Sequence, residues 1–197
     1  YSSFELSFFI VCPMFVCLEI IAGSFSNIFF GSEFTEAGNI IRILMVTTIF
    51  SAISNVVRTN YLIPAQKDTI YVKSTIYGAI VNLIFNSLFI RKYGAYGACI
   101  GTIAAELILM IYQSYNARDT INFLKVFKIF LKYLMISIVI GVFVLLLEFS
   151  SLNDMLKLIL QIIVAVVLYF ILNYKYIIYD FFGRKKVSLQ SSSETKC

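Results

Sequence analysis

The sequence lacks histidine altogether, with none among its 197 residues. A histidine general base and a histidine metal ligand are therefore excluded. It also lacks a glycine-rich phosphate loop or any other nucleotide motif. The only carboxylates close together in a loop are Glu33 and Glu36, which fit the start of a helix. Since the breaks between its apolar stretches are short as well, we do not expect an enzyme.

Charge is scarce, because only 14% of the residues are charged while 60% are hydrophobic and the mean hydropathy is +0.88. An average soluble domain has about 25% charged residues. A bilayer core about 30 Å thick needs about 20 residues of helix. We therefore expect an all-α membrane protein with six transmembrane helices, at residues 6–22, 40–62, 70–90, 96–115, 130–149 and 155–174.

The four cysteines show neither metal-ligand nor redox spacing. Cys12, Cys17 and Cys99 lie in apolar stretches, where we expect them to be small buried hydrophobic residues. The chain begins with Tyr1, and no secretory signal peptide is present at its start. We therefore expect it to be the C-terminal part of a longer protein.

The basic residues predict the orientation, because Lys and Arg accumulate in short cytoplasmic connections. If both ends of the chain lie in the cytoplasm, twelve of the sixteen basic residues fall on the inner side. Only Arg42, Arg91, Lys92 and Lys157 then lie outside. We expect residues 175–197 to form a disordered cytoplasmic tail. Scattered among apolar spans, these charges give no support to nucleic-acid binding.

Polar residues recur at helical spacing within three of the predicted spans, which places each set on one face of its helix. They are Thr48, Ser51, Asn55 and Arg58 in the second span, Thr75, Gly78, Asn82 and Asn86 in the third, and Thr102, Glu106 and Gln113 in the fourth. Polar groups are costly in lipid. We therefore expect the three faces to line a shared interior.

Structural explanations remain open for several of these residues. Asn, Thr and Ser in membrane helices often only bond to a neighbouring helix, a contact worth about 0.6 to 2 kcal/mol. Arg58 lies near the inner surface, where a long side chain extends toward water. Glu106 is harder to explain in this way, because a carboxylate near mid-membrane must be paired, protonated or hydrated.

The fifth and sixth spans are apolar around almost their whole circumference, with Ser137, Gly141 and Gln161 as nearly the only exceptions. Such helices are typical of the periphery of a bundle or a lipid-facing groove. We therefore expect a four-span part at residues 1–116 and two additional helices at residues 117–174. The Gly97-x-x-x-Gly101 spacing at the start of the fourth span predicts close helix packing.

Several short motifs, in this order, resemble the C-terminal part of bacterial polysaccharide flippases of the Wzx type. They are FGSEFTEA at 30–37, YLIPAQKD at 61–68, Asn82 with Asn86, KYGAYGA at 92–98 and IAAE at 103–106. The flippases share a superfamily with lipid II flippases and multidrug and toxin extrusion antiporters. The resemblance covers roughly residues 13–132.

The resemblance implies a carrier with twelve or fourteen spans in two lobes, of which this chain matches the ninth to fourteenth. It implies a multi-pass location in the bacterial inner membrane and transport of a polyprenyl-pyrophosphate-linked oligosaccharide by alternating access. The implied partners are the lipid bilayer, this lipid-linked oligosaccharide, the missing N-terminal lobe and a polysaccharide polymerase. No cofactor is implied beyond a coupling proton or sodium ion.

Under this interpretation the substrate cavity is lined by Asn55, Arg58, Asn82, Asn86, Thr102, Glu106 and Gln113. Arg58 is the candidate for the pyrophosphate near the inner mouth. The alternative in the same superfamily is a cation-coupled exporter of small molecules or drugs, in which Glu106 would carry the coupling ion.

Overall fold

The computed structural model describes residues 1–150 and 153–174. The expected tail at 175–197 lies outside these described residues. The described part contains six long helices, α1 (Ser2–Phe30), α2 (Thr35–Val57), α3 (Asp68–Tyr93), α4 (Ala95–Ala117), α5 (Phe123–Glu148) and α6 (Asp154–Leu172). A 3₁₀-helix, η1 (Ser32–Phe34), precedes α2, and a π-helix, η2 (Arg58–Leu62), follows it. All six long helices are long and apolar enough to cross a membrane, which confirms the predicted all-α membrane fold.

Most helices extend beyond the predicted spans. α1 has 29 residues and continues well past the expected 6–22, and α5 begins at Phe123 instead of residue 130. Hydropathy marks only the part of a helix that crosses hydrocarbon, whereas backbone hydrogen bonding continues the helix into the interface. The start of α5 is fixed by Asn122, whose side-chain oxygen accepts a hydrogen bond from the Lys125 backbone N–H at 3.2 Å.

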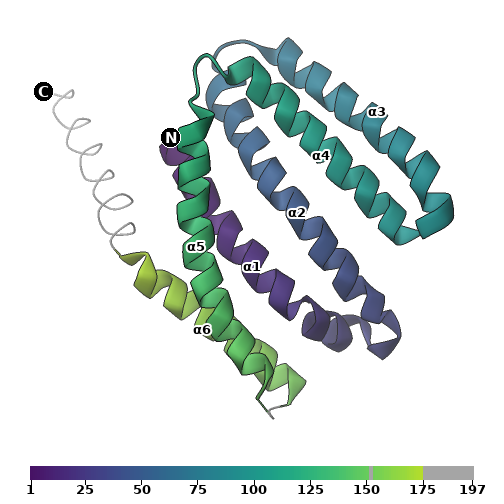
Figure 1. Cartoon of the computed structure of the whole chain (residues 1–197), viewed down its shortest axis with the longest axis vertical. Coiled ribbons are helices and arrows are strands. Elements are labelled where there is room, and N and C mark those ends of the chain that lie inside the picture. The colour runs from purple at the N-terminus through teal and green to yellow at the C-terminus, as the bar shows by residue number, and fades with distance from the viewer. Residues whose placement is uncertain (151–152, 175–197) are drawn as a thin grey trace, which may run out of the picture.

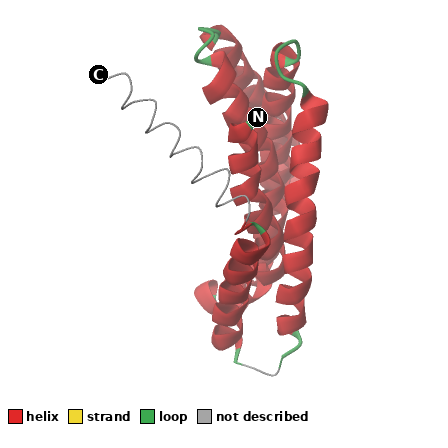
Figure 2. Ribbon diagram, turned by 90° about the vertical axis from the view of Figure 1, so that its left-hand side faces the viewer, coloured by secondary structure: helices red, strands yellow, loops and turns green. Residues whose placement is uncertain are grey.

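The helices form an up-and-down bundle in which consecutive helices run in opposite directions (Figure 1). In it α3 packs on α4, α4 on α2, α2 on α1, and α1 on both α5 and α6. The connections gather at the two ends of the bundle (Figure 2). At one end Ser3 donates to Asn60 at 3.0 Å, and the Asn122 backbone N–H donates to the Tyr1 hydroxyl at 3.1 Å. The start of α1, the end of η2 and the α4–α5 connection therefore share one end, which we predict to be cytoplasmic.

α3 and α4 form the tightest pair, joined by Gly94 alone, whose φ of 56° is left-handed and suits glycine. A Cβ added to Gly97 would lie 2.7 Å from the Ile90 backbone nitrogen and closer still to the Phe89 carbonyl oxygen. A Cβ on Gly101 would meet the Asn86 side chain instead. The close packing predicted from the glycine spacing is therefore confirmed.

α5 connects the two hydrophobic cores of the bundle. One core joins Phe8 of α1, Val57 of α2 and Tyr133 of α5, while the other joins Ile21 of α1, Ile140 of α5 and residues of α6. The buried residues of α5 recur at three- and four-residue spacing and include Val126, Ile129, Tyr133, Ser137, Ile140 and Val144. The uniformly apolar sequence of α5 conceals this buried face.

A proline in α1 removes the regular hydrogen-bond donor of one backbone carbonyl, and a side chain of α6 donates to that carbonyl instead. Pro13 lies inside α1 and has no N–H, so the Phe9 carbonyl oxygen loses its regular helical donor. The Tyr169 hydroxyl of α6 donates to this oxygen at 2.5 Å, and the centroids of the Phe9 and Tyr169 rings lie 5.0 Å apart. The contact holds α6 against α1.

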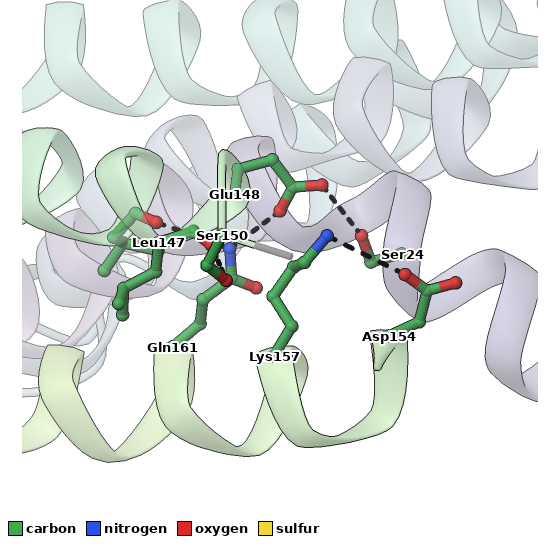
Figure 3. A network of polar contacts seen from close by, with 8 residues as sticks. Ser24, Leu147, Glu148, Ser150, Asp154, Lys157 and Gln161 are labelled. Atoms are coloured by element: carbon green, nitrogen blue, oxygen red, sulfur yellow. Dashed lines mark hydrogen bonds and ion pairs between the residues drawn. The ribbon is translucent and has the colours of Figure 1, made fainter. Parts of the chain in front are cut away.

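A polar network near the other end of the bundle joins α1, α5 and α6 (Figure 3). Glu148 accepts hydrogen bonds from the Ser24 hydroxyl at 3.2 Å and from the Gln161 side-chain amide at 2.8 Å. Gln161 is fully buried. Lys157 forms an ion pair with Asp154 at 3.7 Å on the first turn of α6. These bonds give α6 a fixed position that its apolar sequence does not predict.

Candidate functional site

A polar cavity of about 220 Å³ lies between α2, α3 and α4. Its lining is unusual for a membrane bundle because all but one of the residues carry a polar side-chain group. They are Ser51, Ser54, Asn55, Arg58, Tyr71, Thr75, Glu106, Leu109 and Gln113. Four of the seven predicted site residues therefore meet here, namely Asn55, Arg58, Glu106 and Gln113.

Glu106 connects α4 to α2 within this cavity. The Ser51 hydroxyl donates to its carboxylate at 2.7 Å, so the two helices are joined by a short hydrogen bond in the middle of the bundle. Both residues are only partly buried. Within the described residues the carboxylate thus accepts from Ser51 and also lines the cavity, which suits a group that contacts a ligand there.

Gln113 closes the cavity between α4 and α3. It is fully buried and its side-chain amide donates to the Ser74 hydroxyl at 2.9 Å. Its side-chain oxygen has no hydrogen-bond partner within the described part of the chain. An unpaired buried amide oxygen is costly, and a ligand or water that donates to it would remove that cost.

Arg58 begins the π-helix η2 and lies over the Tyr71 ring, with its guanidinium carbon 5.2 Å from the ring centroid. Its nitrogen also approaches the Tyr71 hydroxyl at 3.4 Å. π-helical turns are rare and occur frequently at functional sites. No carboxylate is paired with Arg58 in the described residues, so its charge is free to meet an anion.

The other three predicted residues lie further along α3 and α4 and do not line this cavity. Asn86 donates its side-chain amide to Asn82 at 2.8 Å, and its own amide oxygen is buried against Gly101 without a hydrogen-bond partner in the described chain. The Thr102 hydroxyl donates to the Ala98 carbonyl within α4 at 3.0 Å. Their contacts belong to the α3–α4 packing, and their place in a larger cavity stays a prediction.

Two polar lining residues, Ser54 and Tyr71, were not on the polar faces identified from the sequence. Ser54 follows Ser51 by three residues, and Tyr71 precedes Thr75 by four, so helical spacing could have identified both. Arg42 is a further polar residue whose role needed the structure. It reaches across to α1, where its Nε donates to the Glu19 carbonyl at 2.8 Å.

No group of three or more metal-ligating side chains lies together in residues 1–150 and 153–174. The site chemistry of the described chain is therefore that of hydroxyls, amides, one carboxylate and one guanidinium. Such a set can bind a hydrated, hydrogen-bonding head group and neutralise an anion.

Six helices long and apolar enough to cross a membrane, three of which enclose a polar cavity, define the described chain as a multi-pass, all-α membrane protein. The fold is similar to that of the lipid II flippase MurJ in an inward closed conformation, with a TM-score of 0.71 and 23% sequence identity. The similarity covers 91% of this chain and 38% of that one. At this identity the match establishes the fold of part of such a protein.

Two curated sequences are also similar. An uncharacterized membrane protein of Methanocaldococcus jannaschii is 30% identical over 168 residues, which cover 85% of this chain and 32% of that protein. A putative O-antigen transporter of Shigella dysenteriae is 26% identical over 88 residues, which cover 45% of this chain and 22% of that protein. The chain thus spans a third or less of the length of these relatives. No protein-family model matches it.

Proposed function

We propose that this chain forms part of a carrier that moves a lipid-linked oligosaccharide across the bacterial inner membrane by alternating access. The observation that carries the proposal is the polar cavity between α2, α3 and α4. The names of two similar proteins, a flippase and a putative transporter, support the proposal. None of the three is named as an enzyme.

The cavity supplies what a glycan head group needs on its way through hydrocarbon. Stripping water from hydroxyls without replacement costs several kcal/mol per group, on the order of 4–8 in an apolar solvent. Asn55 and Thr75 are exposed on the wall of the cavity, and the side-chain oxygen of Gln113 has no hydrogen-bond partner among the residues that the structure describes. These groups can replace lost hydration, while a lipid tail remains outside among the apolar helices.

Arg58 is the residue we assign to the pyrophosphate of the substrate. A guanidinium binds phosphate oxygens with two parallel hydrogen bonds and keeps its charge in the bilayer. Its contact with Tyr71 holds the side chain at the cavity wall. With Arg58 at the end that we predict to be cytoplasmic, the substrate would first be met from the side on which lipid-linked sugars are assembled.

The remaining wall of the cavity is proposed to come from another part of the full protein. Asn55 and Thr75 lie on the outer surface of the described bundle. The Thr75 hydroxyl donates to the Tyr71 carbonyl at 3.1 Å, but lipid would offer no hydrogen-bond partner to the Asn55 side-chain amide. The chain covers only 38% of the flippase that it resembles. A second lobe facing these residues would enclose the cavity, and rocking of the two lobes would open it to each side in turn.

Thiol accessibility tests this assignment. In the protein as its host encodes it, with native cysteines replaced by serine, we expect Asn55→Cys and Thr75→Cys to react with a membrane-impermeant thiol reagent. Ile84→Cys is the matched control, because Ile84 is exposed on the opposite face of α3. Equal protection of all three positions would contradict a water-accessible cavity.

The second candidate function is a cation-coupled exporter, favoured by the single carboxylate of the cavity, Glu106. Loss of surface polysaccharide on deletion of the gene supports the flippase, whereas a change in drug susceptibility supports the exporter. Glu106→Gln separates them further. In an exporter coupled through Glu106 it should abolish the dependence of transport on the ion gradient, whereas in an uncoupled flippase that dependence should be absent from the start.

A further inference from the structure

A second and larger cavity of about 620 Å³ opens between α2, α4 and α5. It lies on the opposite face of α2 from the polar site, against Ile49, Phe50 and Ile53. Its other walls are formed by residues such as Ile111 of α4 and Phe127 and Phe130 of α5. The volume is within the range of about 300–1,000 Å³ that small-ligand sites occupy. Because its walls are apolar, water would gain few hydrogen bonds in it.

One end of this crevice carries a cation. Arg118, just beyond the C-terminus of α4, lines the crevice together with Tyr115. Its guanidinium carbon lies 3.9 Å from the centroid of the Tyr115 ring, and its side chain is 53% exposed. Tyr and Arg at a helix end are typical of the membrane interface, where the ring meets the head groups and the charge meets water.

Polar groups between the mouth and the apolar interior are few. Ser114, one helical turn before Arg118, lines the crevice, and its buried hydroxyl has no hydrogen-bond partner within the described residues. Arg118 is the one charged residue among those that line the crevice, and the nearby Asp119 carboxylate is 91% exposed and lies 3.7 Å from its Nε, beyond hydrogen-bonding distance. The site therefore has an apolar body with a cation at one end.

We propose that this crevice binds one anionic phospholipid of the surrounding leaflet. One acyl chain would lie between α2, α4 and α5, and the phosphate would lie on Arg118. Basic pockets between membrane helices at the cytoplasmic side bind anionic head groups. A neutral hydrocarbon would fill the crevice without binding the Arg118 guanidinium. The site is separate from the polar cavity and does not depend on what the carrier transports.

The proposal is tested in nanodiscs that hold the full protein in a mixture of phosphatidylglycerol and phosphatidylcholine. A phosphatidylglycerol with a photoreactive acyl chain should label α2 near Ile49, α4 near Ile111 and α5 near Phe127. Arg118→Gln should reduce the retained phosphatidylglycerol, counted by native mass spectrometry, roughly five-fold. Arg91→Gln is the matched control, an exposed arginine in the last turn of α3 at the other end of the bundle, and should change nothing.

A second variant fills the crevice without touching the charge. Ile111→Trp places a larger side chain at a residue that is already 50% exposed, so the fold should tolerate it. It should remove acyl-chain labelling while Arg118 remains. Equal retention of phosphatidylglycerol, phosphatidylethanolamine and phosphatidylcholine would overturn the proposal. Cross-linking of the crevice to another segment of the same protein, in place of lipid, would overturn it as well.

Discussion

Tyr169→Phe removes one oxygen atom and leaves the aromatic packing of α6 on α1 in place. In the native protein the Tyr169 hydroxyl donates to the Phe9 carbonyl, which Pro13 deprives of its regular donor. Hydrogen bonds between membrane helices contribute about 0.6 kcal/mol on average and about 1.7 at most. Because this carbonyl has no regular helical N–H, we expect the loss to lie at the upper end, about 1.5 kcal/mol.

Tyr169→Phe made in a Pro13→Ala background tests whether the proline is the reason for this cost. Alanine at position 13 restores an N–H that bonds to the Phe9 carbonyl within α1, so loss of the tyrosine hydroxyl should then cost about 0.5 kcal/mol. The expected coupling between the two positions is therefore about 1 kcal/mol, above the ~0.5 kcal/mol scatter of independent sites. Equilibrium unfolding in mixed micelles of the four proteins measures it. If Tyr169→Phe costs the same in both backgrounds, the proline-based explanation is wrong.

Five further substitutions, which test three predictions, probe other contacts by the same unfolding measurement. Gly97→Ala should destabilise the protein by about 2 kcal/mol, because the added methyl group meets the rigid backbone of α3. Gly101→Ala should be nearly neutral, because its methyl group meets the Asn86 side chain, which can move. A larger loss of stability for Gly101→Ala than for Gly97→Ala would refute this difference. Gln161→Leu should cost about 1 kcal/mol by removing the bond to Glu148, and Ser150→Ala, which loses only a bond within its own chain segment, should cost almost nothing. Arg42→Met should destabilise by about 1–2 kcal/mol by freeing the Glu19 carbonyl, and an unchanged midpoint would show that this bond contributes nothing.

The number and class of the helices could be predicted because a membrane span needs a long apolar stretch, and polar breaks separate such stretches in this sequence. Helix ends were less predictable. α5 begins at Phe123, directly after the cap residue Asn122, in a segment that hydropathy assigns to a connection. The π-helix after α2 had no signal in the spacing of apolar residues.

The site was predictable to the extent that it follows helical periodicity. Asn55, Arg58, Glu106 and Gln113 share a cavity because each lies on the polar face of its own helix and the three faces meet. Asn86 and Thr102 lie on similar faces, yet their side chains bond within their own helices beside the glycines that bring α3 and α4 together. Where along their length two helices come into contact depends on which helices pack together, and a single sequence does not reveal this. The same holds for the Glu148–Gln161 bond, which joins two helices that look uniformly apolar.

The bond between Tyr169 and Phe9 also sets an order of events during biosynthesis. The two residues are 160 positions apart, so at about 5–20 residues per second α1 would wait roughly ten to thirty seconds for its partner to leave the ribosome. Until α6 has been synthesised this contact cannot form. A nascent chain stalled before α6 is therefore expected to lack the packing of α6 on α1 that this bond supports in the finished bundle.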